Sequence, residues 1–90
     1  MAEPEITLPE PVVPSAEQIA INYTAMGHSV KMINDTISGD TILERATDKQ
    51  NCVDTNVAQL ELMVAQSYWT TEDMTAVNAA ITAGKAYTAS

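Results

Sequence analysis

Few side chains in this sequence are placed to do chemistry. The single histidine, His28, has no cysteine beside it and no Asp or Glu within one helical turn. The single cysteine, Cys52, has Lys49 nearby but no histidine within reach in the sequence. Glu72 and Asp73 are adjacent, so on a helix they point to diverging faces and form a poor metal site. We therefore expect a histidine at the surface or at its boundary, a structural thiol, and two carboxylates that cap a helix.

The usual catalytic and nucleotide-binding motifs are missing from the sequence. It contains no GxGxxG, no P-loop, no CxxC and no HExxH pattern, and one cysteine cannot form an internal disulfide. A helical body built from 90 residues also leaves little room for an enclosed substrate pocket. The sequence therefore predicts no catalytic residue, no metal, no cofactor and no small-molecule substrate. A helical-bundle enzyme ranks last among the hypotheses.

Composition narrows the range of partners. Twelve carboxylates against four basic residues give a net charge of −8, which disfavours nucleic acids and anionic membranes because both need clustered Lys and Arg. We expect no signal peptide and no membrane-spanning segment, since no run of about 18 apolar residues occurs. Phenylalanine is absent, so the core must be built from Ile, Leu, Val, Met and Ala, which is typical of a helical bundle. The expected partners are other protein chains.

Residues 1–14 hold all four prolines of the chain. Proline removes backbone donors and keeps the preceding residue extended, so this segment is predicted to be an extended arm and not a helix. Apolar residues alternate with glutamates, whereas a plain linker would carry Gly and Ser. We expect the arm to bind a neighbouring chain, with a floppy terminus as the alternative. The predicted contact residues are Ile6, Leu8, Pro9, Pro11, Val12 and Val13.

The strongest periodic signal predicts a helix over residues 16–38. Ser15 is a favourable N-cap with Gln18 completing a capping box, and Gly39 is a typical left-handed C-cap. Gly27 inside the helix suggests close approach by a neighbour. The apolar residues are spaced alternately by four and three, as in a heptad stripe: Ile19, Tyr23, Met26, Val30, Ile33 and Ile37.

A second helix is predicted over residues 41–67, with Thr41 and Glu44 as a second capping box. Its apolar stripe includes Val57, Leu60 and Val64. Poor helix formers precede this stripe, so either the helix kinks near residues 50–54 or a partner stabilises it. Gln50 lies at a core-facing position, where it either sets the register or marks the point at which the stripe leaves the core. The short loop before this helix predicts an antiparallel hairpin with the first helix.

A third helix is predicted over residues 71–87, with Thr70 as its N-cap and Val77 and Ile81 in its apolar stripe. Trp69 is expected to clasp the second and third helices together. Small residues four apart, namely Ala76, Ala80 and Gly84, would let two backbones approach closely, and Gly84 would also loosen the last turn. The fold class is therefore all-α: an antiparallel helical hairpin plus a shorter third helix. This small three-helix bundle, residues 15–90, follows the extended proline-rich arm, residues 1–14.

Three stretches near the C-terminus carry a recognisable pattern. Residues 54–63 contain N-V-x-x-L-E-x-M, residues 68–73 contain W-T-x-E-D, and residues 79–87 contain A-I-x-A-G-x-A-Y. This pattern resembles a loosely defined group of small proteins of tailed bacteriophages, and it covers only about the last 35 residues. The resemblance implies a small virion or assembly component, located at the head, portal or tail, and brings no catalytic residue with it.

Two non-enzymatic hypotheses follow. The first is a structural virion accessory protein of cement, adaptor or baseplate type. It would dock through its arm and helices on larger virion proteins or on copies of itself, and would be located in the virion. The alternative is a small acidic regulator or inhibitor that binds a basic protein. Neither hypothesis involves nucleic acid, a membrane or a small-molecule substrate.

Overall fold

The computed structural model describes residues 14–90, which form three α-helices and no β-strand. Helix α1 spans Ala16–Ser38, α2 spans Ala46–Val64 and α3 spans Thr75–Ala86. The prediction of an all-helical fold is confirmed. Residues 1–13, which make up most of the predicted arm, lie outside the described residues.

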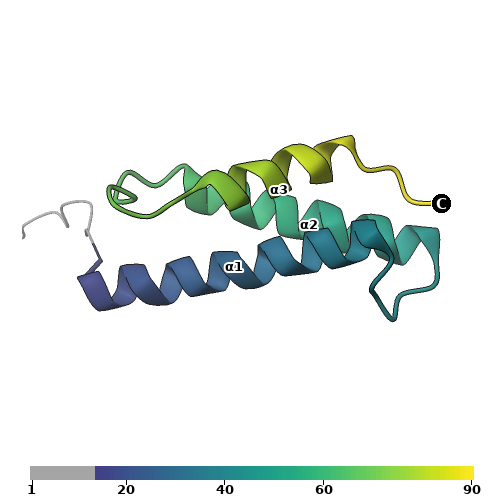
Figure 1. Cartoon of the computed structure of the whole chain (residues 1–90), viewed down its shortest axis with the longest axis horizontal. Coiled ribbons are helices and arrows are strands. Elements are labelled where there is room, and N and C mark those ends of the chain that lie inside the picture. Colours follow the sequence, from purple (N-terminus) through teal and green to yellow (C-terminus); the bar gives the residue numbers. More distant parts are fainter. Residues whose placement is uncertain (1–13) are drawn as a thin grey trace, which may run out of the picture.

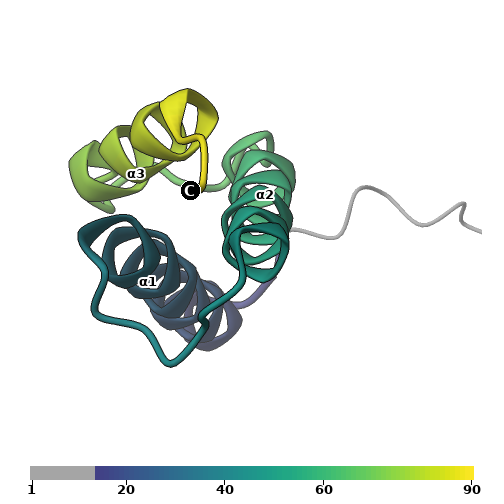
Figure 2. The same cartoon turned by 90° about the vertical axis from the view of Figure 1, so that its right-hand side faces the viewer.

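The three helices lie side by side around one core. Figure 1 shows α2 running back beside α1 and α3 returning in the direction of α1. Seen from one end, the helices occupy the corners of a triangle (Figure 2). The loop between α2 and α3 lies at the end of the bundle where α1 begins, and the C-terminal residues lie at the opposite end (Figure 1).

Helix α1 begins and ends where its capping residues predict. The Ser15 hydroxyl accepts a hydrogen bond from the Gln18 backbone N–H at 3.1 Å. The Gln18 side chain donates to Asn22 instead of returning to the cap, so only half of the capping box forms. Gly39 lies in the left-handed region at φ 87°, and the Asp40 N–H then reaches the Asp35 carbonyl at 2.8 Å. This is a Schellman-type end that satisfies carbonyls left open by the last turn.

Helix α2 begins at Ala46, so the prediction of a start at residue 41 is wrong. The Thr41 hydroxyl accepts from the Leu43 N–H at 3.2 Å, two residues ahead, and thereby closes a local turn. Such side-chain turns compete with helix initiation for the same backbone donors. The connection from α1 is therefore residues 39–45, and α2 then continues without a break through residues 50–54 to Val64.

Helix α3 begins at Thr75, so the predicted start at residue 71 with Thr70 as N-cap is also wrong. The Asp73 carboxylate accepts from the Thr75 N–H at 3.0 Å, which again is a local turn two residues long. The helix ends at Ala86, and Tyr87 is already extended with ψ 130°.

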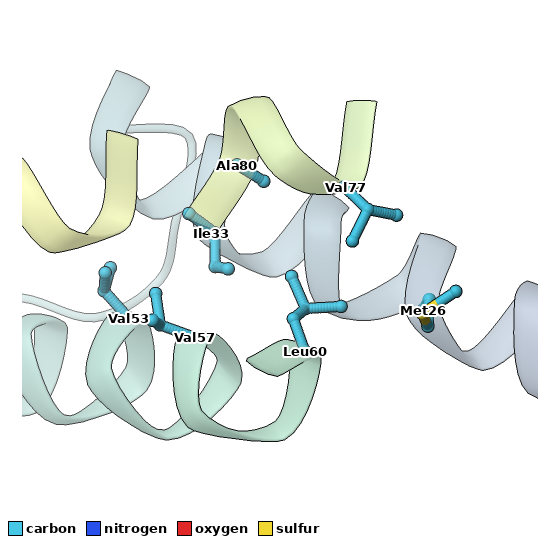
Figure 3. Packing of buried hydrophobic residues seen from close by; sticks show 7 residues of the cluster. All are labelled: Met26, Ile33, Val53, Val57, Leu60, Val77 and Ala80. Carbon is cyan, nitrogen blue, oxygen red and sulfur yellow. The ribbon is translucent and has the colours of Figure 1, made fainter. Parts of the chain in front are cut away.

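The core lies where the three helices face one another. Val53, Val57 and Leu60 of α2 point from below toward α1 and α3 in the close view of Figure 3. Ile33 of α1 and Ala80 of α3 face them there. The buried apolar residues are Met26, Ile33, Val53, Val57, Leu60, Val77 and Ala80.

Close approach of α3 to the other helices depends on Gly84, which is buried. A Cβ atom built at residue 84 would run into the Val57 side chain, and it would lie 3.3 Å from Val53 Cγ1 and 3.5 Å from Ile33 Cγ2. The missing side chain at Gly84 thus leaves room for side chains of the neighbouring helices. Gly27 is different, because a Cβ atom there would meet nothing within 4 Å in the described part of the chain. The close neighbour expected at Gly27 is therefore not found there.

The two glycines make a matched pair for stability measurements. We predict that Gly84→Ala lowers the free energy of unfolding by about 1–3 kcal/mol, because the added methyl overpacks the core. Gly27→Ala is expected to raise it by up to about 1 kcal/mol, since alanine favours an exposed helix interior. Urea unfolding followed by far-UV circular dichroism measures both changes. A Gly84→Ala protein as stable as the parent would contradict this account of α3 packing.

Candidate interaction surfaces

The residues predicted to bind a partner through the arm lie outside the described residues. These residues are Ile6, Leu8, Pro9, Pro11, Val12 and Val13. The structure describes the point where the arm joins the body: Pro14 is half-buried and Ser15 is extended, with φ −60° and ψ 160°. The chain therefore joins the first turn of α1 in an extended conformation.

The predicted helix-packing residues are not equally buried. Met26, Ile33, Val57, Leu60 and Val77 lie in the core, and Ile19, Tyr23, Val30, Val64, Trp69 and Ile81 are half-buried. Ile37 is exposed, and Thr36 is buried in its place. The prediction that Ile37 packs in the core is therefore wrong.

Three aromatic residues meet at one end of the bundle, and we call Tyr23, Tyr68 and Trp69 the aromatic corner. The ring centroids of Tyr68 and Trp69 are 4.7 Å apart, and those of Tyr23 and Trp69 are 6.2 Å apart. Both pairs are tilted, at 49° and 53°, which is a favourable arrangement for aromatic rings. Each of the three residues is half-buried. The corner thus keeps part of its ring surface at the outside of the bundle.

Hydrogen bonds fix the aromatic corner in place. Trp69 Nε1 donates to the Met63 carbonyl at 2.6 Å, and the Tyr23 hydroxyl donates to the Asp73 carbonyl at 2.6 Å. Asn22 Nδ2 donates to the Tyr68 hydroxyl at 3.3 Å. The corner therefore joins α1 to the end of α2 and to the loop before α3. Sequence analysis singled out Trp69, but its contact with Tyr23 has no signal along the chain.

Gln50 binds the segment that follows α3. Its Oε1 accepts from the Ala89 N–H at 2.8 Å, while its Nε2 donates to the Tyr87 carbonyl at 3.2 Å and to Asp54 at 2.9 Å. The amide pairs with the extended backbone much as a neighbouring strand would. A glutamine at a core-facing position is the only sequence signal for this contact.

We predict that Gln50→Ala frees residues 87–89. Losing two hydrogen bonds to the backbone should speed exchange of the Ala89 amide hydrogen and lower the free energy of unfolding by about 1 kcal/mol. Amide hydrogen exchange measured by NMR checks the first effect. Gln59→Ala, an exposed substitution on the same helix, serves as the control and should leave the Ala89 exchange rate unchanged. Equal rates in all three proteins would contradict the contact.

Several large apolar side chains lie at the surface of the described residues. Ile42, in the loop between α1 and α2, is 96% exposed, and Leu62 on α2 is 68% exposed. Ile21, Met32 and Ile37 on α1 are also exposed. Sequence analysis placed Ile42 inside a helix and therefore missed it.

The side chains that could take part in chemistry lie apart from one another in the structure. His28 is exposed on α1, whereas Cys52 is half-buried with its Sγ 3.6 Å from the Thr36 hydroxyl. Within residues 14–90, no three His, Cys, Asp or Glu side chains gather as metal ligands would. None of the helices in that range combines the length and apolar character needed to cross a bilayer.

Charged side chains mostly lie free on the surface. Of the nine carboxylates in residues 14–90, Asp35 pairs with Lys31 at 2.7 Å and Glu61 pairs with Lys85 at 2.9 Å. Hydrogen bonding and charge from Asp35 raise the pKa of Lys31. Hydrogen bonds from the Thr75 side chain, and then from its backbone N–H, lower the pKa of Asp73 below its ordinary value of 3.8.

The lowered pKa of Asp73 predicts how the start of α3 responds to acid. Because the pKa is lower in the folded chain, the carboxylate stabilises the fold at pH above 3.8. That contribution is lost as the pH falls from 3.8 through the lower folded-state pKa. An NMR titration of the Thr75 amide should therefore show a midpoint below 3.8. Asp73→Asn should abolish this titration, and a midpoint at or above 3.8 would contradict it.

Comparison with known proteins returns no match among family models, curated proteins or solved structures. The resemblance of residues 54–87 to small phage proteins thus stays a prediction from the sequence.

Proposed function

We propose that this protein is a non-enzymatic structural component of a tailed-bacteriophage virion, of cement, adaptor or baseplate type. Its helical hairpin and shorter third helix form a docking unit. Its proline-rich arm, residues 1–14, binds a neighbouring chain. The partners are larger virion proteins, copies of itself, or both.

The observation that supports an interaction role is the balance between buried and exposed apolar residues. Within residues 14–90, seven apolar residues are buried, whereas five large ones are exposed: Ile21, Met32, Ile37, Ile42 and Leu62. A domain of this size buries only a modest share of its surface, so its own core cannot cover them. Covering such side chains against a partner would contribute roughly 25 cal/mol per Å² of apolar surface.

Ile42 is the most exposed of these five side chains, and it lies in an ordered turn. The bond from the Leu43 N–H to the Thr41 hydroxyl fixes the turn on either side of it. Gly39 sets the direction in which the loop leaves α1. An apolar side chain presented by an ordered turn loses little conformational entropy when a partner covers it.

The phage assignment is supported by the sequence pattern alone. Its residues serve as packing and capping elements: Val57 and Leu60 lie in the core, Trp69 belongs to the aromatic corner, and Gly84 admits Val57. The matched residues therefore build the helical body, whereas the arm and the exposed apolar side chains would provide the contacts with other virion proteins.

Mass spectrometry of purified virions tests the proposal. We expect the chain at a fixed copy number per particle, retained through washes at high salt because apolar contacts are not screened. Deleting residues 1–13 should abolish retention, whereas His28→Ala, an exposed change on α1, should preserve it. Absence of the full chain from virions would overturn the proposal.

The charge balance favours one second candidate, a small acidic regulator of a basic protein. The chain carries a net charge of −8, and only two carboxylates in the described residues form ion pairs. Association of this kind depends on unpaired surface charge and weakens as salt rises. Binding to a single basic partner that is lost at high salt would favour this candidate over a virion protein.

A further inference from the structure

The three residues of the aromatic corner are only partly buried by the packing of the bundle, so part of their surface is free to contact a partner. The chain has four aromatic residues, and three of them, Tyr23, Tyr68 and Trp69, meet at this corner. All three are half-buried. The polar groups of Trp69 and Tyr23 already donate to backbone carbonyls. These two polar groups are therefore already paired, which leaves the rings for contact with a partner.

Hydrogen-bond donors lie beside this ring surface. The Tyr68 hydroxyl accepts from Asn22 and keeps its own hydrogen to donate. Gln18 in turn donates to Asn22 at 3.0 Å, so the two amides form a row on α1 that leads to Tyr68. A surface of aromatic rings with adjacent donors suits an extended proline-rich segment, whose rings pack on aromatic faces and whose carbonyls accept hydrogen bonds.

This chain carries such a segment itself. Residues 9–14 read Pro-Glu-Pro-Val-Val-Pro, with Pro11 and Pro14 separated by two residues as in polyproline II ligands. Its sequence favours an extended polyproline II conformation, because proline restricts its own φ and the conformation of the preceding residue. Binding it therefore costs less conformational entropy than binding an ordinary six-residue segment would.

The junction with α1 indicates which copy of the corner receives the segment. Ser15 is extended with ψ 160°, and Pro14 has its φ fixed by its ring. Folding back onto Tyr23 of the same chain would require the chain to reverse at Pro14 and Ser15, where the fixed φ of the proline and the extended serine oppose it. Resting on the docking role proposed for the arm, we infer that residues 9–14 of one copy bind the aromatic corner of a second copy.

The size of the contact sets its strength. A six-residue segment buries far less than the roughly 1,200–2,000 Å² of a stable protein interface. The pairwise affinity is therefore weak, and the contact becomes strong only where many copies are held side by side.

Paramagnetic NMR on mixed full-length chains tests the inference. One chain is isotope-labelled, and the other carries a nitroxide at Thr7→Cys in a Cys52→Ser background, so that the label is unique. We expect the nitroxide to broaden the Trp69 indole N–H of the labelled chain. The Ile42 amide, at the opposite end of the bundle, should not broaden.

Paired variants decide which residues carry the contact. Joint substitution Pro9→Ala and Pro11→Ala should weaken the association by about tenfold or more, and so should Tyr68→Ser. Pro4→Ala, elsewhere in the arm, is the matched control and should leave it unchanged. The arm variants keep the inference testable if Tyr68→Ser disturbs folding.

Three results would overturn the inference. They are an absence of broadening between chains, an association insensitive to the joint proline substitution, and broadening found only within a singly labelled chain at high dilution. The last would show that the arm binds its own corner. If virion retention still depended on residues 1–13, the proposed function would stand while this inference failed.

Discussion

Close packing of α3 depends on the missing side chain at Gly84. The space that a methyl would need is filled by Val57, with Val53 and Ile33 close behind it. Helix α3 contributes only Val77 and Ala80 to the buried apolar set, so it can cover the other two helices only by lying very near them. A larger residue at 84 would lift the helix and uncover the core on which the bundle depends.

The core built in this way is small, so large apolar side chains remain at the surface. Within residues 14–90, Ile42 and Leu62 remain exposed, and none of the three helices covers them. At both ends of the bundle, polar contacts add to the apolar packing that holds the helices together. The Tyr23 hydroxyl holds the Asp73 carbonyl at one end, and the Gln50 amide holds residues 87–89 at the other. These polar contacts therefore fix the body of the bundle at both ends.

Local signals allowed prediction of the all-helical class and of both ends of α1, because Ser15 and Gly39 act on their own neighbours. The starts of α2 and α3 could not be predicted. Thr41 and Asp73 each bond a backbone N–H two residues ahead, and a sequence pattern does not reveal whether such a residue caps a helix or closes a turn. The aromatic corner and the Gln50 contact join residues far apart in the chain, so only tertiary structure could reveal them.

The row of small residues on α3 repeats every four positions, and a repeat of that kind is ambiguous about alignment. Gly84 removes that ambiguity: sliding α3 by one turn, about 5.4 Å, would bring Ala80 to the place of Gly84, where its Cβ atom would run into the Val57 side chain. The hydrogen bonds to Asp73 at its start and to Tyr87 at its end match only one of these alignments. The missing side chain at Gly84 and the polar contacts at the two ends of α3 therefore select the same register of this helix.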